Sequence, residues 1–224
     1  MKIKGIKIRD KTPIMKGQLY VTDEARTICF EEEKTSDIVN IHFHMEAGQY
    51  GVYGNEYIPP FIEKEGVKKA DILTLVIDDN QKHFSSWILD VKKAVGGEDV
   101  ILHLVEQLAE SIKHKNTITN YMEDYTERQH VGYVTRELQG ERIQEAVCKK
   151  KAYIENEKMA LERVPILIGT GMKTKLLKEE AKLKVLTAFQ NNYIELRGEK
   201  HIIENYLSHE EGDKYVCDLD VVCF

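Results

Sequence analysis

Two aspartates and a lysine stand at the ends of two neighbouring apolar segments. Asp71 lies near the start of the first segment, and Asp90 and Lys92 close the second. Carboxylates a few ångströms apart repel each other unless a cation or a proton lies between them. Hard divalent cations such as Mg²⁺ take oxygen ligands and keep several waters, so two or three carboxylates are enough to hold one. A bound cation of this kind lowers the pKa of a water and stabilises charge on a phosphate during displacement. The residue types therefore indicate metal-assisted hydrolysis of a phosphodiester, with a cross-strand ion pair on a surface hairpin as the alternative.

The two apolar segments, residues 70–77 and 84–92, are predicted to be the strands of one hairpin with a polar turn at residues 80–83. The first strand is apolar on both faces, which is typical of a central strand that is covered on both sides. The second strand alternates near its end, so Asp90 and Lys92 are expected on the face opposite their apolar neighbours.

The register of this hairpin decides whether the charged residues meet. A turn at residues 80–83 places Asp71 opposite Lys92. It also places Leu73 opposite Asp90, and diagonal neighbours on one face lie about 7–8 Å apart. We therefore expect the two aspartates and the lysine to converge at one end of the hairpin.

A helix that begins at Glu98 is predicted to follow the hairpin. Glu98 and Asp99 suit its first turn, where they meet the positive end of the helix dipole. Gln107 falls at the edge of an apolar stripe, so its amide is expected to point toward the sheet, either supporting the acidic residues or making a structural hydrogen bond. Residues 130–136 then read as a strand, and a strand–helix–strand run of this length favours a parallel crossover. The apolar stripe consists of Val100, Ile101, Leu104, Val105, Leu108 and Ile112.

This order of residues resembles the PD-(D/E)XK nuclease superfamily. The pattern of that superfamily is an aspartate on one strand, an acidic-x-Lys motif on the next, and often a glutamine in the following helix. Here these are Asp71, Asp90-Val91-Lys92 and Gln107, and the proline of the family is replaced by Ala70. The resemblance covers about residues 40–136. It implies a restriction-endonuclease-like α/β fold, in which a mixed sheet of antiparallel hairpin, helix and strand is flanked by helices, and it implies a supporting role for Gln107.

The resemblance also implies roles for the other residues. Asp71 and Asp90 would hold Mg²⁺ or Mn²⁺, and the carbonyl of Val91 would be a further ligand. Lys92 would orient or help activate the attacking water and stabilise the developing negative charge. Members of the family usually carry one more acidic residue upstream, and Glu46, which ends an apolar strand, is the candidate for this third carboxylate.

Residues 40–46 suggest a second, different set of metal ligands. His42, His44 and Glu46 share one face of a predicted strand. Two histidines at i and i+2 with a glutamate could bind a transition metal. A polar, solvent-exposed strand face is the commoner arrangement for such residues.

The remaining segments are predicted from the same periodicities. Residues 1–136 are expected to form the nuclease-like core, and residues 137–224 a helical and β-hairpin addition packed on it as one compact unit. The run Glu31–Lys34 is expected to be a solvated turn, and Lys149–Lys151 either a solvated helix face or a phosphate contact. Outside the hairpin and its helix, the predicted elements are strands at 2–9, 18–30 and 37–45, helices at 137–162 and 172–189, a hairpin at 193–196 and 201–203, and a strand at 215–224.

Composition limits the possible function classes. The chain of 224 residues is 42% hydrophobic and 31% charged, and its net charge of −6 argues against a protein that coats nucleic acid through charge alone. Its 4 cysteines lack metal-binding spacing and are expected to be reduced thiols. No apolar run approaches the length of a membrane span, so a cytoplasmic protein without a membrane partner is expected.

These patterns predict a Mg²⁺-dependent DNA endonuclease or exonuclease, and the resemblance suggests a setting in restriction or phage defence. DNA is the expected partner, with a homodimer or a partner subunit of a DNA-processing complex left open. The alternative is a catalytically inactive nuclease-like fold that serves as a binding or assembly subunit. The acidic net charge, the undefined third carboxylate and the thin apolar seam of helix 137–162 favour that alternative.

Overall fold

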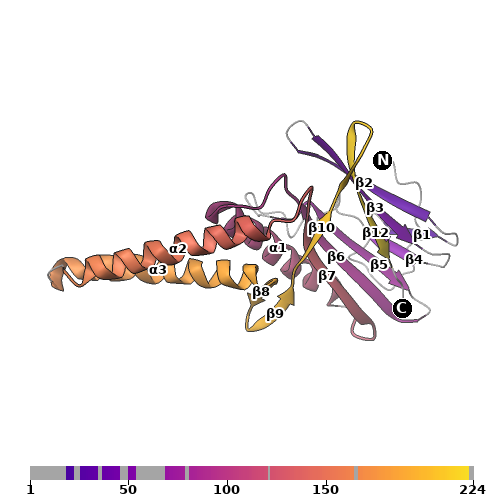
Figure 1. The fold of residues 1–224 in the computed structure, drawn as a ribbon. Coiled ribbons are helices and arrows are strands. Elements are labelled where there is room, and N and C mark those ends of the chain that lie inside the picture. The colour runs from indigo at the N-terminus through magenta and orange to yellow at the C-terminus, as the bar shows by residue number, and fades with distance from the viewer. Residues whose placement is uncertain are drawn as a thin grey trace.

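Two β-sheets pack face to face, helices cover the other face of the larger sheet, and a long pair of helices extends from one end (Figure 1). The computed structural model describes residues 19–22, 26–34, 37–45, 50–53, 69–78, 81–120, 122–163 and 166–221. The strand expected at residues 2–9 lies outside this set. The α/β class with a mixed, helix-flanked sheet is confirmed.

The larger sheet has the strand order β1-β4-β5-β6-β7-β10. Neighbouring strands are antiparallel from β1 to β6 and parallel from β6 to β10. The link from β6 to β7 runs through α1 (Glu98–Thr119), so the predicted parallel crossover is confirmed. The strands are β1 (Leu19–Thr22), β4 (Tyr50–Tyr53), β5 (Ile72–Asp78), β6 (His83–Val91), β7 (Thr126–Thr135) and β10 (Glu204–Leu207).

The smaller sheet has the strand order β11-β12-β3-β2, in which β12 and β3 run parallel. Its inner face packs on the larger sheet, where Phe43 of β3 meets Trp87 of β6 edge-on with ring centroids 5.4 Å apart. The apolar strand β12 near the C-terminus is paired on both sides, with β3 and β11, and its Cys217 and Leu219 pack against the larger sheet. The strands are β2 (Arg26–Lys34), β3 (Asp37–Met45), β11 (His209–Glu211) and β12 (Lys214–Val221).

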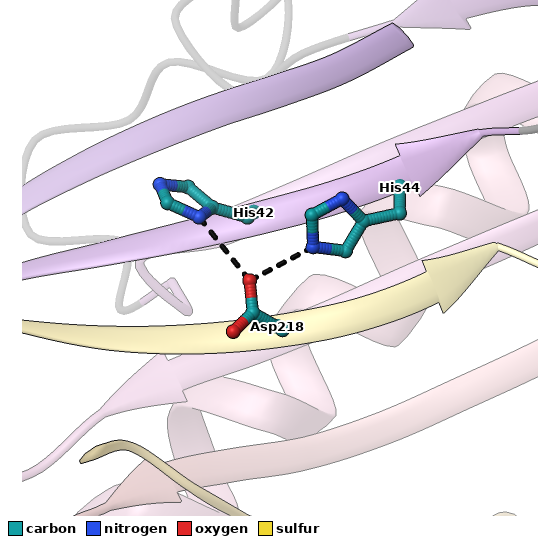
Figure 2. A group of neighbouring side chains, drawn as sticks. All are labelled: His42, His44 and Asp218. Atoms are coloured by element: carbon teal, nitrogen blue, oxygen red, sulfur yellow. Dashed lines mark hydrogen bonds and ion pairs between the residues drawn. The ribbon is translucent and has the colours of Figure 1, made fainter. Parts of the chain in front are cut away.

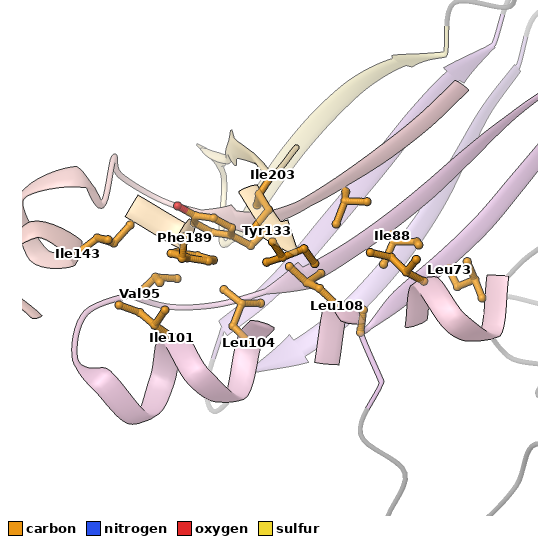
Figure 3. Packing of buried hydrophobic residues seen from close by; sticks show 14 of the residues in the cluster. Leu73, Ile88, Val95, Ile101, Leu104, Leu108, Tyr133, Ile143, Phe189 and Ile203 are labelled. Carbon is orange, nitrogen blue, oxygen red and sulfur yellow. The ribbon is translucent and has the colours of Figure 1, made fainter. Parts of the chain in front are cut away.

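Helix α1 packs on the opposite face of the larger sheet and forms the main core with β5, β6 and β7 (Figure 3). Its buried apolar residues recur at helical spacing, as the stripe predicted, although Val100 on the flank is 38% exposed. Each large apolar side chain buried in this way contributes about 1.5–3 kcal/mol. The buried apolar residues of α1 are Ile101, Leu104, Leu108, Ile112 and Ile118.

Helices α2 (Gly140–Leu161) and α3 (Ile166–Gln190) form an antiparallel arm that extends well beyond the sheets (Figure 1). Ile143, Val147 and Ile154 of α2 are buried, in agreement with the predicted apolar seam. Helix α3 begins at Ile166, before the predicted start at residue 172, so the glycines at 169 and 171 lie within the helix. A two-stranded sheet of β8 (Tyr193–Leu196) and β9 (Glu199–Ile202) follows.

The β5–β6 hairpin forms, but its predicted register is wrong. Leu73 pairs with Ile88 instead of with Asp90. The cause lies at the turn, because β5 ends at Asp78. Its Oδ1 accepts a hydrogen bond from the backbone N–H of Gln81 at 3.1 Å, which starts the turn one residue earlier than assumed.

The corrected register changes which charged residues face each other. Continuing the ladder by one residue puts Asp71 opposite Asp90, and not opposite Lys92 as expected. Every pair has moved by two residues along β6, and a shift of two leaves each side chain on its original face. The predicted convergence on one face is therefore retained.

Strand β2 contradicts a second expectation. The run Glu31–Lys34 is not a turn, because it lies within β2, where Glu31 pairs with Asn40 and Lys34 with Asp37. Pairing along β3 thus overrides the weak strand preference of the glutamates.

The C-terminal third supplies a strand to each sheet, β10 to the larger and β12 to the smaller. It is thereby built into both sheets and does not only cover them. Within the described residues, no helix combines the length and the apolar content that crossing a membrane requires.

Candidate active site

The end of β6 carries an aspartate and a lysine on the face toward α1. Leu89 and Val91 are buried between the two sheets, which turns Asp90 and Lys92 to the opposite face. Asp90 is completely buried. Lys92 Nζ donates a hydrogen bond to Asp90 Oδ1 at 2.8 Å, and 17% of the lysine side chain is exposed. The ammonium group therefore lies at the boundary between a buried carboxyl group and solvent.

Asp71 lies just before β5 and is tied to the end of β6. Its Oδ2 accepts a hydrogen bond from the backbone N–H of Val91 at 2.8 Å. Asp71 also acts on the pKa of Asp90 through its side chain and its charge, so the two carboxyl groups are close to each other. The two aspartates that the sequence singled out are thus neighbours in space.

The electrostatics of this carboxyl pair favour a bound proton or cation. Burial, followed by the hydrogen bond and the charge of Asp71, raises the pKa of Asp90 to about 8, although Lys92 acts to lower it. Asp90 Oδ2 is buried and has no hydrogen-bond partner among the described residues. A single ammonium group does not offset two carboxylates, and a hard divalent cation with oxygen ligands fits this donor set.

Gln107 links Lys92 to the segment that leads into β5. Its Oε1 accepts a hydrogen bond from Lys92 Nζ at 3.0 Å, and its Nε2 donates to the carbonyl oxygen of Lys69 at 2.9 Å. The sequence left open whether this amide supports the acidic residues or makes a structural hydrogen bond; it bonds both to the lysine beside Asp90 and to the backbone, and its supporting role stays a prediction. One turn further along α1, Ser111 Oγ accepts a hydrogen bond from the N–H of Ala70 at 2.8 Å. Helix α1 thereby fixes the backbone at the start of β5.

Two more residues were expected as metal ligands. Val91 is buried at the end of β6, next to both aspartates, and the role of its carbonyl group stays a prediction. Glu46 lies outside the described residues, so its position as third carboxylate also stays a prediction.

Basic side chains gather at the same edge of the sheet. Because β6 and β7 are parallel, their C-terminal ends meet; Lys92 and Lys93 follow β6, and Arg136 follows β7. Lys92, Lys93 and Arg136 line one small depression at this edge. The Arg136 guanidinium stacks over the ring of Tyr215 at 3.6 Å from its centroid. Sequence reasoning did not single out Arg136, because only the parallel pairing of β6 with β7 brings it to the edge that carries Lys92 and Lys93.

The lysine run of α2 is divided between interior and surface. Lys150 is buried, and its Nζ pairs with Glu98 Oε2 at 2.6 Å and with Glu179. Lys149 pairs with Glu145 on the same helix and has 75% of its side chain exposed. A cavity of about 740 Å³ opens beside these residues at the base of the arm, and neither aspartate of the candidate active site lines it. The middle lysine therefore anchors the arm to α1.

The two histidines of β3 meet a carboxylate that was not predicted. Asp218 of β12 places its Oδ1 3.2 Å from His42 Nδ1 and 2.8 Å from His44 Nε2 (Figure 2). Their expected partner, Glu46, lies outside the described residues. The i, i+2 spacing signalled the histidine pair, but no local pattern signals a partner strand so far along the chain.

The described residues thus define an α/β protein with a buried carboxyl–lysine–glutamine cluster at the end of a central hairpin. No protein-family model matches this chain, and no curated protein and no solved structure matches it. Function is therefore inferred from the geometry of the chain itself.

Proposed function

We propose that the chain is a metal-dependent phosphodiesterase that cuts DNA, with Mg²⁺ or Mn²⁺ as its cofactor. One observation carries the proposal: Asp71, Asp90, Lys92 and Gln107 form a continuous series of contacts. These side chains come from the start of β5, the end of β6 and the middle of α1. They are the residue types, in the order along the chain, that characterise the PD-(D/E)XK pattern.

A restriction-endonuclease-like fold is part of the same proposal. An antiparallel hairpin, a crossover helix and a parallel third strand support it. The candidate residues lie where the hairpin strands meet the crossover helix, on the face that α1 covers. This location makes the site part of the rigid core and not of a loop.

The carboxyl pair would hold the cation. When bound, Mg²⁺ neutralises phosphate charge and lowers the pKa of a water. Asp71 and Asp90 would be its ligands, the latter through the Oδ2 atom that lacks a partner among the described residues. The Val91 carbonyl and Glu46 would complete the protein ligands. Metal ligands must be deprotonated, so binding would displace the proton that Asp90 holds below about pH 8.

Lys92 would act on the attacking water and on the phosphate. Two of its three N–H donors are directed at Asp90 and Gln107, which leaves one for a water or a phosphate oxygen. The contacts to Asp90 and Gln107 hold the ammonium in one orientation, so its charge is in place when negative charge develops on the phosphate. Lys93 and Arg136 at the same edge would contact the DNA backbone.

DNA cleavage by the purified chain tests this proposal. Linear, circular and single-stranded DNA are incubated with Mg²⁺, Mn²⁺ or EDTA, and product formation is followed over time. Lys92→Ala is expected to lower the rate by more than about 100-fold, because it removes the positioned charge. Lys151→Ala, which removes the same charge from an exposed position on α2, is the matched control and should retain activity. Metal-dependent cutting that persists in a folded Lys92→Ala variant would contradict the site assignment.

A binding or assembly subunit with a nuclease-like fold is the second candidate. The burial of Asp90 favours it, because a carboxyl group with a pKa of about 8 is neutral at pH 7 and can donate its proton to Asp71. The cluster would then be satisfied without a cation. Absence of cleavage, together with absence of a rise in melting temperature on addition of Mg²⁺ or Mn²⁺, would support this candidate over the nuclease.

A further inference from the structure

Strands β3 and β12 present a row of polar side chains on the outer face of the smaller sheet. Along both strands buried and outward residues alternate, and the parallel register sets Asp218 beside His42. The outward residues are Asn40, His42 and His44 on β3 and Asp218 and Asp220 on β12, and the buried residues between them are Ile41, Phe43, Cys217 and Leu219. Because the buried residues face the larger sheet, this row lies on the side away from the candidate active site. Figure 2 shows the three side chains His42, His44 and Asp218 of this row.

The donor atoms of the three polar side chains have the spacing of a metal site. Asp218 Oδ1 is 3.2 Å from His42 Nδ1 and 2.8 Å from His44 Nε2, and the three atoms lie within 4.8 Å of one another. In a tetrahedral zinc site with bonds of about 2.0–2.1 Å, neighbouring donor atoms are about 3.3 Å apart. A cation among these three atoms therefore requires only small side-chain movements.

Both histidines can offer a lone pair at the required atom. A neutral imidazole carries its proton on either ring nitrogen, so the nitrogen that now faces Asp218 can become a ligand by a change of tautomer. The exposed fractions of the His42, His44 and Asp218 side chains are 24%, 40% and 45%, so a hydrated ion can reach the site from solvent.

A third histidine lies next to this group. His209 Nε2 on β11 is 3.9 Å from Asp218 Oδ2, and its side chain is 59% exposed. A rotation of this side chain could add an imidazole nitrogen as a fourth donor to the set. Imidazoles with one carboxylate suit zinc and related transition metals, whereas Mg²⁺ prefers an all-oxygen set.

We propose that His42, His44 and Asp218 form a binding site for a divalent transition metal of the zinc class, with His209 as an accessory ligand. The ion would bridge β3 and β12. Two of its ligands, His44 and Asp218, are 174 residues apart in the sequence. Because the unfolded chain does not hold these ligands together, the ion would stabilise the folded smaller sheet. The site does not depend on the proposed nuclease function and takes a different class of metal.

Calorimetric titration of the full chain with Zn²⁺ tests this site, after treatment with EDTA and dialysis. All samples carry Cys148→Ser, because an exposed thiol would add zinc binding of its own. One equivalent of Zn²⁺ is expected to bind and to raise the melting temperature, in the presence of excess Mg²⁺. His44→Ala and Asp218→Asn should each weaken Zn²⁺ binding by more than about 100-fold. Removing a residue that only hydrogen-bonds to a metal ligand already lowers metal affinity by about 10–100-fold, and removing a ligand itself should lower it further. His209→Ala should have a smaller effect, of about 10-fold.

His103→Ala is the matched control, because it removes an exposed histidine from α1 and leaves the smaller sheet intact. A readout that needs no substitution beyond Cys148→Ser comes from Co²⁺, whose visible absorption is much stronger in a tetrahedral site with nitrogen ligands than in water. Failure of the folded, otherwise unsubstituted chain to bind one equivalent of Zn²⁺ would overturn the proposal. Equal affinities of the Asp218→Asn and His103→Ala variants would also overturn it.

Discussion

The backbone N–H of Val91 donates a hydrogen bond to Asp71 Oδ2 at 2.8 Å, across the open end of the β5–β6 hairpin. This bond attaches the first carboxyl group of the candidate site to the strand that carries the second. It holds Asp71 beside the buried Asp90, and the proximity of the two groups is one cause of the raised pKa of Asp90. The hairpin thus keeps two mutually repelling groups together through its backbone.

Asp90→Asn should stabilise the metal-free protein at alkaline pH. Burial and Asp71 raise the pKa of Asp90 from 3.8 to about 8, so between these values the folded state binds a proton that the unfolded state has lost. The contribution of Asp90 to stability is therefore fully present below about pH 4 and is lost as the pH rises through about 8. An asparagine cannot ionise, and its amide can accept from Lys92 and donate to Asp71.

The expected gain in free energy of unfolding is on the order of a few kcal/mol at about pH 9 and much smaller at about pH 4. Urea denaturation in EDTA across this range measures it, and the same variant should no longer cleave DNA. A loss of stability at high pH would show that Asp90 is stabilised as a carboxylate.

Gln107→Ala should reduce DNA cleavage without abolishing it. Gln107 does not belong to the proposed metal ligands but orients Lys92 and holds the carbonyl group of Lys69. Loss of such an orienting partner lowers activity by about 10–100-fold. Steady-state kinetics should place the loss in kcat, with KM little changed. Asn116→Ala removes an exposed amide from the same helix and should leave kcat unchanged; equal rates for the two variants would exclude an orienting role.

Gly132→Ala should weaken the pairing of β7 with β10. A Cβ atom at this position would lie 2.3 Å from the backbone oxygen of Glu204, which cannot move without breaking the parallel ladder. The expected destabilisation is about 1–3 kcal/mol. Gly140→Ala at the start of α2 meets no atom within 4 Å and should change stability by less than about 0.5 kcal/mol. Guanidinium denaturation of both variants measures the difference, and similar midpoints would contradict the close approach.

Lys150→Ala and Lys149→Ala should have very different effects although the residues are adjacent. Removing Lys150 leaves the carboxylates of Glu98 and Glu179 partly buried without this partner. We expect a loss of about 2–3 kcal/mol, below the value for a fully buried pair because Glu98 retains 28% exposure. Removing the exposed Lys149 should cost less than about 0.5 kcal/mol. Thermal denaturation compares the two, and equal melting temperatures would argue against an anchoring role for Lys150.

Most of the candidate site could be predicted because its residues lie within one hairpin and one helix. Alternation along a strand put Asp90 and Lys92 on one face, and helical periodicity directed Gln107 to the sheet. The register could not be predicted, because it depends on a single turn contact between Asp78 and Gln81. The error was harmless for the site since a shift of two residues preserves the face of every side chain.

Pairings between distant segments could not be predicted from local patterns. Asp218 reaches His42 and His44 only because β12 inserts next to β3, and alternation within either strand does not name its neighbour. The same cause explains the acidic run Glu31–Lys34, whose strand conformation comes from pairing with β3 and not from its own propensity.

The parallel pairing of β3 with β12 also sets an order of assembly. The hairpin, α1 and β7 form a nearly continuous stretch of chain, whereas β3 must wait for a partner that follows it by about 170 residues. Contacts of such long range form slowly, and during synthesis they form only after the second segment has left the ribosome. Until then, the apolar face of β6 that carries Trp87 lacks its cover from the smaller sheet. The nascent chain therefore exposes this apolar face until β12 has been made, and we expect it to be a substrate for chaperones that recognise exposed apolar surfaces.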